Sequence, residues 1–141
     1  MPFNHFSDLS EVDQLTHDDI INMWCEDLEQ HPELQGKNKL EVNGKRCCLG
    51  QLCYIGWLYN VCKRNAKVPL LSKTRILVEY NRCSDYAPDS IVKWAKLSSD
   101  SGGFTDERCQ TKNRTTLAYL NDHGTKWPKI AKFIRSKPEG L

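Results

Sequence analysis

Hydrophobic residues recur at helical spacing soon after the start of the chain. Ile20, Trp24 and Leu28 follow one another every four residues, which places them on one face of a helix. A Thr-x-x-Asp capping sequence precedes this run and a His-Pro pair follows it. The pattern predicts a helix over residues 17–30.

The next segment carries the signal of a β-hairpin. Asn43-Gly44 lies between two short runs, residues 39–42 and 45–48. Asn-Gly favours a two-residue type I′ turn because both central positions need a positive φ. We therefore predict one small hairpin here.

Residues 48–64 are apolar around almost the whole circumference of a helix. Residues 47–62 contain no charged side chain, and Lys63 and Arg64 then supply the positive charge that suits a helix C-terminus. A helix that is hydrophobic on all sides is usually surrounded by other elements. This segment is therefore predicted to be the central helix of the fold.

The last part of the chain predicts two further helices. A short helix that carries Leu117 and Leu120 would be capped by Asn113 or Thr115, and Gly124 would end it in the left-handed conformation. Thr125 would then cap a final helix. The apolar residues of that helix follow i, i+3, i+4, i+7 spacing and are Trp127, Ile130, Ala131 and Ile134.

These patterns together predict the fold class. Residues 75–80 suit a short strand and residues 88–98 suit a helix. The expected fold is mainly α (α+β), with four to five helices around the central apolar helix and one small β-hairpin. We expect an N-terminal arm over residues 1–14 and a single globular domain over residues 15–137.

Size and composition exclude several classes of protein. The chain has 141 residues, of which 39% are hydrophobic and 27% charged, and its mean hydropathy is −0.62. One domain of ordinary size accounts for this length. The uncharged stretch of 16 residues is too short to span a bilayer comfortably, and the first residues do not resemble a secretory signal. We expect a soluble protein rather than a membrane, fibrous or secreted one.

Charge is divided unevenly along the chain. Residues 1–35 carry a formal charge of −9 and residues 36–141 carry +11. Either the acidic segment folds back and neutralises the basic body, or the two form surfaces of opposite sign that face partners. The acidic candidates for a partner-facing surface are Asp18, Asp19, Glu26 and Asp27. The basic candidates, for a partner or a phosphate group, are Lys126, Lys129, Lys132 and Arg135.

Catalytic and metal-binding chemistry has only weak candidates. The seven cysteines lack the paired spacing of a zinc site, and their odd number suits free thiols in a reducing compartment. Cys48, near a helix start, and the Asp122-His123 pair are the candidates for an enzyme. Buried packing is the favoured explanation of the thiols; helix capping explains the Asp, and simple exposure near a turn explains the His. We expect no catalytic residue, no metal and no cofactor.

Three blocks of sequence carry a family resemblance. Residues 47–53 resemble a CxLGxLC segment, residues 86–97 an LPxxVxxWAGL segment, and residues 117–134 an LxxLND-x-G-xxFxxIAxxI segment. Blocks of this kind are similar to those of a group of small uncharacterised proteins found mainly in bacteriophages and prophages. The matching positions are Leu49, Gly50, Trp94, Leu120, Asn121, Asp122, Gly124, Ile130 and Ile134. The chain departs from the pattern at Lys96, where glycine is usual, and at Trp127 and Pro128.

The resemblance implies a phage protein that acts in the host bacterial cytoplasm. We expect a non-enzymatic accessory protein that inhibits or decoys a host or antiviral-defence protein by direct binding. The alternative is a binder of a phosphate-bearing ligand, either nucleic acid or a signalling nucleotide, through the basic C-terminal helix. That helix lacks the Asn or Gln side chains that read adenine, so sequence-specific DNA recognition by a helix-turn-helix is disfavoured.

Overall fold

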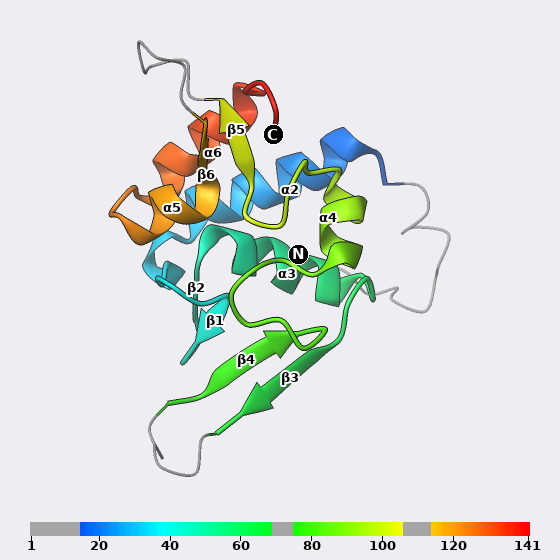
Figure 1. Cartoon of the computed structure of the whole chain (residues 1–141), viewed down its shortest axis with the longest axis vertical. Helices are drawn as coiled ribbons and strands as arrows, with labels where there is room; N and C mark the ends of the chain where they lie inside the picture. The colour runs from blue at the N-terminus through cyan, green and yellow to red at the C-terminus, as the bar shows by residue number, and fades with distance from the viewer. Residues whose placement is uncertain (1–14, 69–74, 106–113) are drawn as a thin grey trace.

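The computed structural model describes residues 15–68, 75–105 and 114–141, and the predicted N-terminal arm lies outside these ranges (Figure 1). Within them the fold is α+β. The elements in chain order are α2 (His17–Gln30), a 3-10 helix (Pro32–Leu34), β1 (Glu41–Val42), β2 (Lys45–Arg46), α3 (Cys48–Leu58), β3 (Arg64–Lys67), β4 (Leu77–Tyr80), α4 (Asp89–Ala95), β5 (Gly103–Thr105), β6 (Arg114–Thr116), α5 (Leu117–Asp122) and α6 (Trp127–Arg135).

The first described helix agrees with its prediction. Thr16 caps α2: its hydroxyl accepts a hydrogen bond from the Asp19 N–H, and the Asp19 carboxylate accepts one from the Thr16 N–H. This reciprocal pair satisfies two of the donors that a helix start leaves free. Ile20, Trp24 and Leu28 all lie buried on the inner face.

The prediction of one small hairpin underestimated the β structure, which comprises two sheets in the described residues. The hairpin itself is confirmed, because Asn43 and Gly44 both have positive φ between β1 and β2. However, β1 also pairs with β4, giving a four-stranded antiparallel sheet in the order β2-β1-β4-β3. A second, two-stranded sheet joins β5 and β6. Strands of two to four residues are too short for alternation to reveal them.

The apolar helix ends earlier than predicted. α3 stops at Leu58, and Arg64 begins strand β3 instead of closing the helix. Asn60 takes a left-handed φ of 63°, its N–H bonds to the Trp57 carbonyl, and the Val61 N–H bonds to the Gly56 carbonyl. This pair of bonds is the Schellman arrangement, which satisfies the last carbonyls of a helix and turns the chain away.

Two predicted helix caps were also wrong. Thr116 and not Thr115 caps α5, where its hydroxyl accepts a hydrogen bond from the Tyr119 N–H; the other candidate, Asn113, lies outside the described residues. The N-cap residue of α6 is Lys126 and not the predicted Thr125, and its side chain forms no capping hydrogen bond. The Trp127 N–H is instead satisfied by Gln35, a residue far away in sequence, so local capping patterns could not reveal it.

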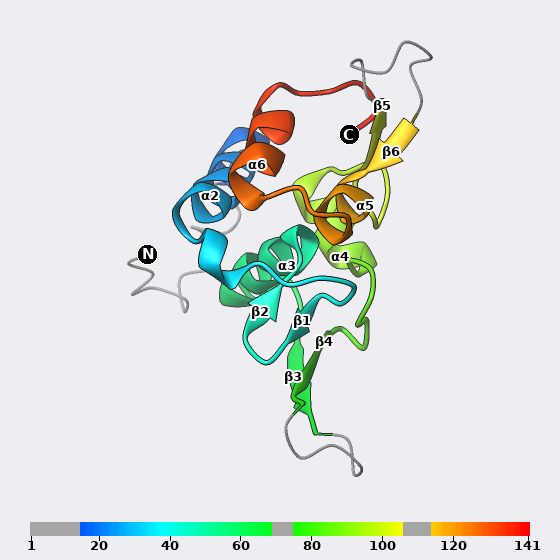
Figure 2. The same ribbon diagram turned by 90° about the vertical axis from the view of Figure 1, so that its left-hand side faces the viewer.

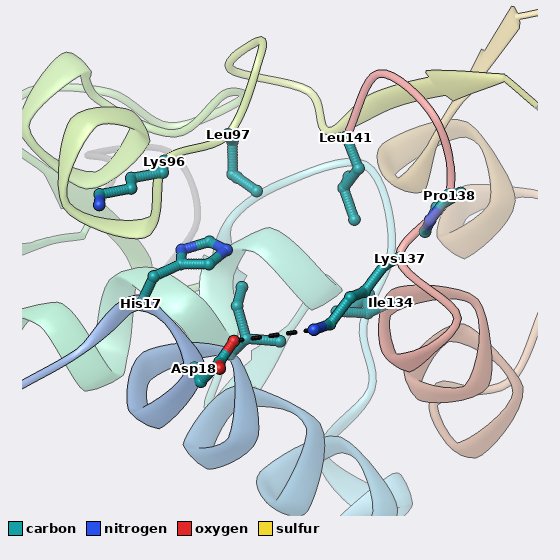
Figure 3. A pocket seen from close by; sticks show the side chains of 9 residues that line it. His17, Asp18, Lys96, Leu97, Ile134, Lys137, Pro138 and Leu141 are labelled. Carbon is teal, nitrogen blue, oxygen red and sulfur yellow. Dashed lines mark ion pairs between the residues drawn. The ribbon is translucent and has the colours of Figure 1, made fainter.

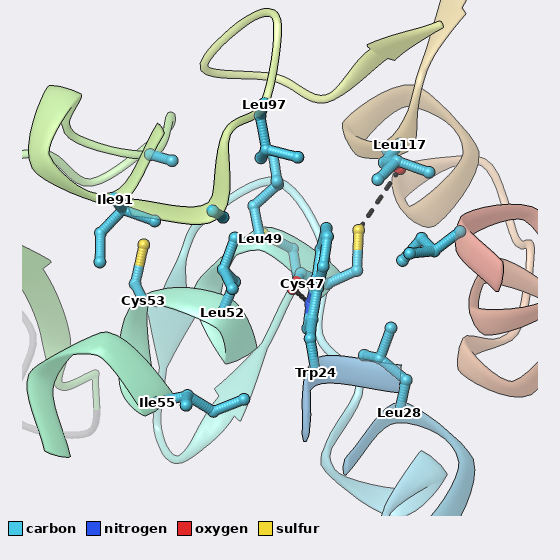
Figure 4. Packing of buried hydrophobic residues seen from close by; sticks show 14 of the residues in the cluster. Trp24, Leu28, Cys47, Leu49, Leu52, Cys53, Ile55, Ile91, Leu97 and Leu117 are labelled. Atoms are coloured by element: carbon cyan, nitrogen blue, oxygen red, sulfur yellow. Dashed lines mark hydrogen bonds between the residues drawn. The ribbon is translucent and has the colours of Figure 1, made fainter. Parts of the chain in front are cut away.

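The buried core joins α2, α3, α4, α5 and α6 (Figure 4). α6 runs beside α2 in both views (Figures 1 and 2), while the β3–β4 hairpin projects away from the helices. Eight of the eleven α3 residues are buried. Trp24 is fully buried and donates a hydrogen bond to the Cys48 carbonyl at 2.8 Å, which ties α2 to the start of α3.

Candidate functional site

Helix α6 separates its apolar and basic residues cleanly. Trp127, Ile130, Ala131 and Ile134 are buried against the core, as their spacing predicted. Lys126, Lys129 and Lys132 are exposed, and within the described ranges none of them takes part in an ion pair. We call these three residues the lysine face. It presents three positive charges that have no ion-pair partner in the part of the chain that the structure describes, two of them on α6 and one at the N-cap of that helix.

Arg135, the fourth basic candidate, has an internal partner. Its guanidinium forms two hydrogen bonds with the Glu29 carboxylate, at 2.9 and 2.8 Å, and a third with the Asn22 side chain at 3.0 Å. The hydrogen bond with Arg135 lowers the pKa of Glu29, and the same bond raises the pKa of Arg135. Arg135 therefore joins α6 to α2 and does not belong to the lysine face.

The acidic candidates mostly make contacts with other residues of the same chain. Asp19 caps α2, and Asp27 accepts a hydrogen bond from the Gln51 amide at 2.9 Å. Glu26 accepts one from the side chain of Asn22, which lies one turn earlier in α2. Asp18 lies 4.0 Å from the Lys137 ammonium group. The two charged segments thus meet along α2 and α6, and part of the charge asymmetry is neutralised there.

The end of α5 and the turn that follows it carry an aromatic pair that sequence reasoning missed. The rings of Tyr119 and His123 stack with centroids 3.9 Å apart, and Tyr119 is 56% exposed. His123 Nδ1 lies 2.9 Å from the Tyr119 carbonyl. Asp122 accepts the Asn38 N–H at 2.8 Å, so its carboxylate is engaged by Asn38 while the His123 ring is engaged by Tyr119. The sequence signal for this pair is the four-residue spacing of Tyr119 and His123, which brings two side chains together at the end of a helix.

Asn121 fixes this turn to the body of the protein. Its side-chain oxygen accepts hydrogen bonds from Gln35, from the Cys48 N–H and from the Trp127 indole, at 3.0 to 3.1 Å. Its amide donates to the Gly36 carbonyl at 2.7 Å. Because Asn121 is fully buried, these bonds satisfy an amide that would otherwise be costly to bury. The start of α6 is therefore held firmly in place.

The thiols in the described ranges are free, and their environment disfavours the thiolate. The free cysteines are Cys25, Cys47, Cys48, Cys53, Cys62 and Cys83. Burial raises the pKa of Cys48 well above the ordinary value and that of Cys47 to about 11. A nucleophilic thiol needs the opposite shift. Cys47 has a structural use instead, because its sulfur accepts the Gly50 N–H at the start of α3.

A buried ion network in the sheet was also missed from the sequence. Glu41 is 2% exposed and accepts hydrogen bonds from Arg46 at 2.9 Å, Tyr80 at 2.5 Å and Arg64 at 2.5 Å. Burial alone would raise the pKa of Glu41, but these three donors outweigh it and lower the pKa. Arg46 continues the network to Gln51. All these groups have partners, and the network connects the sheet to α3 through Gln51.

A cleft of about 510 Å³ lies beside this network and includes Arg46, Gln51 and Tyr54 in its wall. The Arg46 guanidinium sits 3.8 Å from the centroid of the Tyr54 ring, a cation–π contact.

Within the described ranges no group of three or more His, Cys, Asp or Glu side chains is placed to hold a metal ion. In the same ranges, no helix has both the length and the apolar character required to cross a membrane.

The fold and surface define a small α+β domain with a free basic helix face. The family model described as "Domain of unknown function (DUF8296)" matches residues 16–138. The chain therefore belongs to the DUF8296 family. No curated protein and no solved structure matches it.

Proposed function

We propose that this chain is a non-enzymatic phage accessory protein that inhibits or decoys a host or antiviral-defence protein by direct binding. The lysine face of α6 is the surface that binds, and the partner presents an acidic surface to it. One observation carries the proposal: Lys126, Lys129 and Lys132 have no ion-pair partner within the described residues, although Arg135 on the same helix is neutralised.

The geometry of α6 suits this role. Residues three apart on a helix are separated by about 4.5 Å along its axis. The three lysines therefore span about 9 Å along α6, within reach of two or three carboxylates on a partner. Opposite charges on two rigid surfaces speed association and reject wrong partners. Asn121 and the buried face of Trp127 hold the helix so that little ordering is needed on binding.

The resemblance to phage proteins supplies the biological setting of the proposal, namely the host bacterial cytoplasm. The proposal also keeps α3 as the central helix of the fold, an expectation supported by the burial of eight of its eleven residues. Under this arrangement the thiols and tryptophans serve packing, and the exterior charges carry the function.

A comparison of two doubly charge-reversed variants tests the proposal. Lys126→Glu/Lys129→Glu alters the lysine face. Lys63→Glu/Lys93→Glu makes the same charge change at two exposed lysines elsewhere, one just before β3 and one on α4. Each variant and the parent chain are used to capture proteins from infected bacteria, followed by quantitative mass spectrometry. We expect a partner that the parent and the control retain and the α6 variant loses. Absence of any enriched host protein, or equal capture by both variants, would contradict the proposal.

The stacked rings favour a second candidate function. Tyr119 lies in α5 and His123 at the C-cap of that helix, three residues before Lys126, so the stacked pair stands at the end of the helix that leads to the lysine face. Aromatic rings that stack with bases, next to lysines that attract phosphate, are the features of single-strand nucleic acid binding. Under this alternative, Tyr119→Ala weakens binding of a labelled single-stranded oligonucleotide, and binding falls steeply as salt rises. Binding that is unaffected both by Tyr119→Ala and by the rise in salt would exclude nucleic acid binding.

A further inference from the structure

The cavity drawn in Figure 3 and the cleft beside the Glu41 network differ in how their charged groups are used. In the first, a space of about 190 Å³, Asp18 lies 4.0 Å from the Lys137 ammonium group, so the two charges offset each other (Figure 3). The cleft, of about 510 Å³, has Asp27 and Arg46 in its wall. Both are described residues, and no direct ion pair joins them. A ligand in the cleft therefore meets one charge of each sign.

The Gln51 side chain bridges these two charges through its amide. Its N–H donates to the Asp27 carboxylate at 2.9 Å, and its carbonyl oxygen accepts from the Arg46 guanidinium at 3.1 Å. Gln51 and Arg46 are only 3% and 8% exposed, so the bridge is built into the wall. A small group with a donor at one end and an acceptor at the other thus fits between Asp27 and Arg46.

Both charged side chains keep hydrogen-bonding capacity beyond this bridge. Arginine has five N–H donors, and Arg46 uses two of them within the described residues, toward Glu41 and Gln51. Asp27 receives the Gln51 amide on one carboxylate oxygen, and its other oxygen accepts no hydrogen bond from the part of the chain that the structure describes. The cleft therefore offers cationic donors at one end and an anionic acceptor at the other.

The charges around the cleft balance. The charged groups in the wall and directly behind it are Asp27, Glu41, Arg46 and Arg64. Two are negative and two are positive. At the rim, the Lys45 ammonium group donates to the Glu33 carbonyl, and the His31 ring lies 3.2 Å from the Glu33 carboxylate. Because the rim adds one further charge of each sign, the surroundings favour neither a cation nor an anion, but a ligand that carries both charges.

The rest of the wall is mainly apolar. Leu34, Ile55 and Leu58 line it together with Tyr54, whose ring supports the Arg46 guanidinium at 3.8 Å. Ligand pockets of about 300–1,000 Å³ commonly combine such apolar walls with a few polar groups that orient the ligand. The cleft has a volume in this range, so it accepts an alkyl side chain next to its charged pair.

We propose that this cleft binds a free α-amino acid with an apolar side chain. Its carboxylate accepts from Arg46, its ammonium group donates to Asp27, and its side chain packs against Leu34 and Leu58. An amino acid has the same polarity as the Gln51 amide beside it, with a donor toward Asp27 and an acceptor toward Arg46. The site is separate from the lysine face, none of whose residues lines the cleft.

Titration of the full chain with three probes of similar shape tests the proposal. Leucine carries both charged groups, isocaproate lacks the amine, and isoamylamine lacks the carboxylate. Binding is followed through the NMR resonances of the Tyr54 ring and the Gln51 side-chain amide. We expect saturable shifts with leucine and affinity at least about tenfold weaker for each analogue, which loses one charge-assisted interaction. Shifts that do not saturate with leucine, or an analogue that binds as tightly as leucine, would overturn the assignment.

Asp27→Asn separates binding from folding. The asparagine keeps an oxygen that can accept from Gln51, so the fold should be retained, while leucine binding weakens about tenfold and isocaproate binding does not weaken. Glu26→Gln is the matched control, because it removes one negative charge from the neighbouring position of α2, outside the cleft. Leucine affinity that is unchanged in Asp27→Asn, or equally weakened in both variants, would contradict the proposal.

Discussion

Replacement of Gly50 by alanine should destabilise the protein severely, against the ordinary preference of helices for alanine. In an exposed helix interior, Gly to Ala stabilises by about 1 kcal/mol. At Gly50 in α3, a Cβ atom would lie 1.8 Å from the Leu40 carbonyl oxygen and 2.6 Å from its carbonyl carbon. These are backbone atoms, so no side-chain rotation removes the clash.

The surroundings of Leu40 leave little room for relief. Leu40 is fully buried, and its N–H donates to the Ser84 carbonyl at 2.7 Å. The chain would have to move by more than 1 Å, or α3 would have to leave its packing position. Overpacking of a core usually costs about 1–3 kcal/mol. Because backbone must shift here, we expect a loss of at least about 3 kcal/mol in the free energy of unfolding.

Gly56→Ala is the matched control on the same helix. Its added Cβ would lie 2.3 Å from Cδ1 of Ile91, the far end of a side chain that can rotate. We expect a loss of no more than about 1–2 kcal/mol. Urea unfolding followed by circular dichroism measures both variants. A Gly50→Ala protein as stable as the parent, or more stable than Gly56→Ala, would refute the packing of α3 against Leu40.

Three further predictions concern charge and thiols. Because the folded pKa of Glu41 lies below its ordinary value of 4.5, the stability that its carboxylate contributes is present above that value and is lost as pH falls through the folded pKa; Glu41→Gln should therefore reduce the loss of stability that urea titrations show on acidification below pH 4.5. Among the described cysteines, Cys83 is the least buried and should be alkylated by iodoacetamide in the native state before the others, as peptide mass spectrometry would show. Arg135→Ala should lower the free energy of unfolding by about 0.5–1 kcal/mol, whereas Lys132→Ala should change it by less than about 0.5 kcal/mol.

Local patterns in the sequence predicted the helices better than the sheets. The periodicity of Ile20, Trp24 and Leu28 and that of the final helix depend only on nearby residues, and both were confirmed. Strand β4 could be placed only loosely, because its partners β1 and β3 come from separate parts of the chain. The end of α3 also depended on Asn60 taking a left-handed conformation, which an asparagine in a sequence permits but does not require.

The lysine face was predictable in part. Lys126, Lys129 and Lys132 are exposed as an amphipathic helix requires, but the pairing of Arg135 with Glu29 joins residues 106 positions apart. The pairing of Glu41 was equally hidden in the sequence. Its partners Arg64 and Tyr80 lie on other strands, and only the assembled sheet brings them to its carboxylate. Long-range charge pairing decides which surface charges remain free.

Calorimetric titration of the purified partner tests most directly whether the lysine face is the binding surface. The chain, the Lys126→Glu/Lys129→Glu variant and the Lys63→Glu/Lys93→Glu control would each be titrated at low and at physiological salt. We predict affinity at least about tenfold weaker for the α6 variant, with a smaller salt dependence than the parent, and parent-like affinity for the control. Equal affinities for both variants would contradict the account.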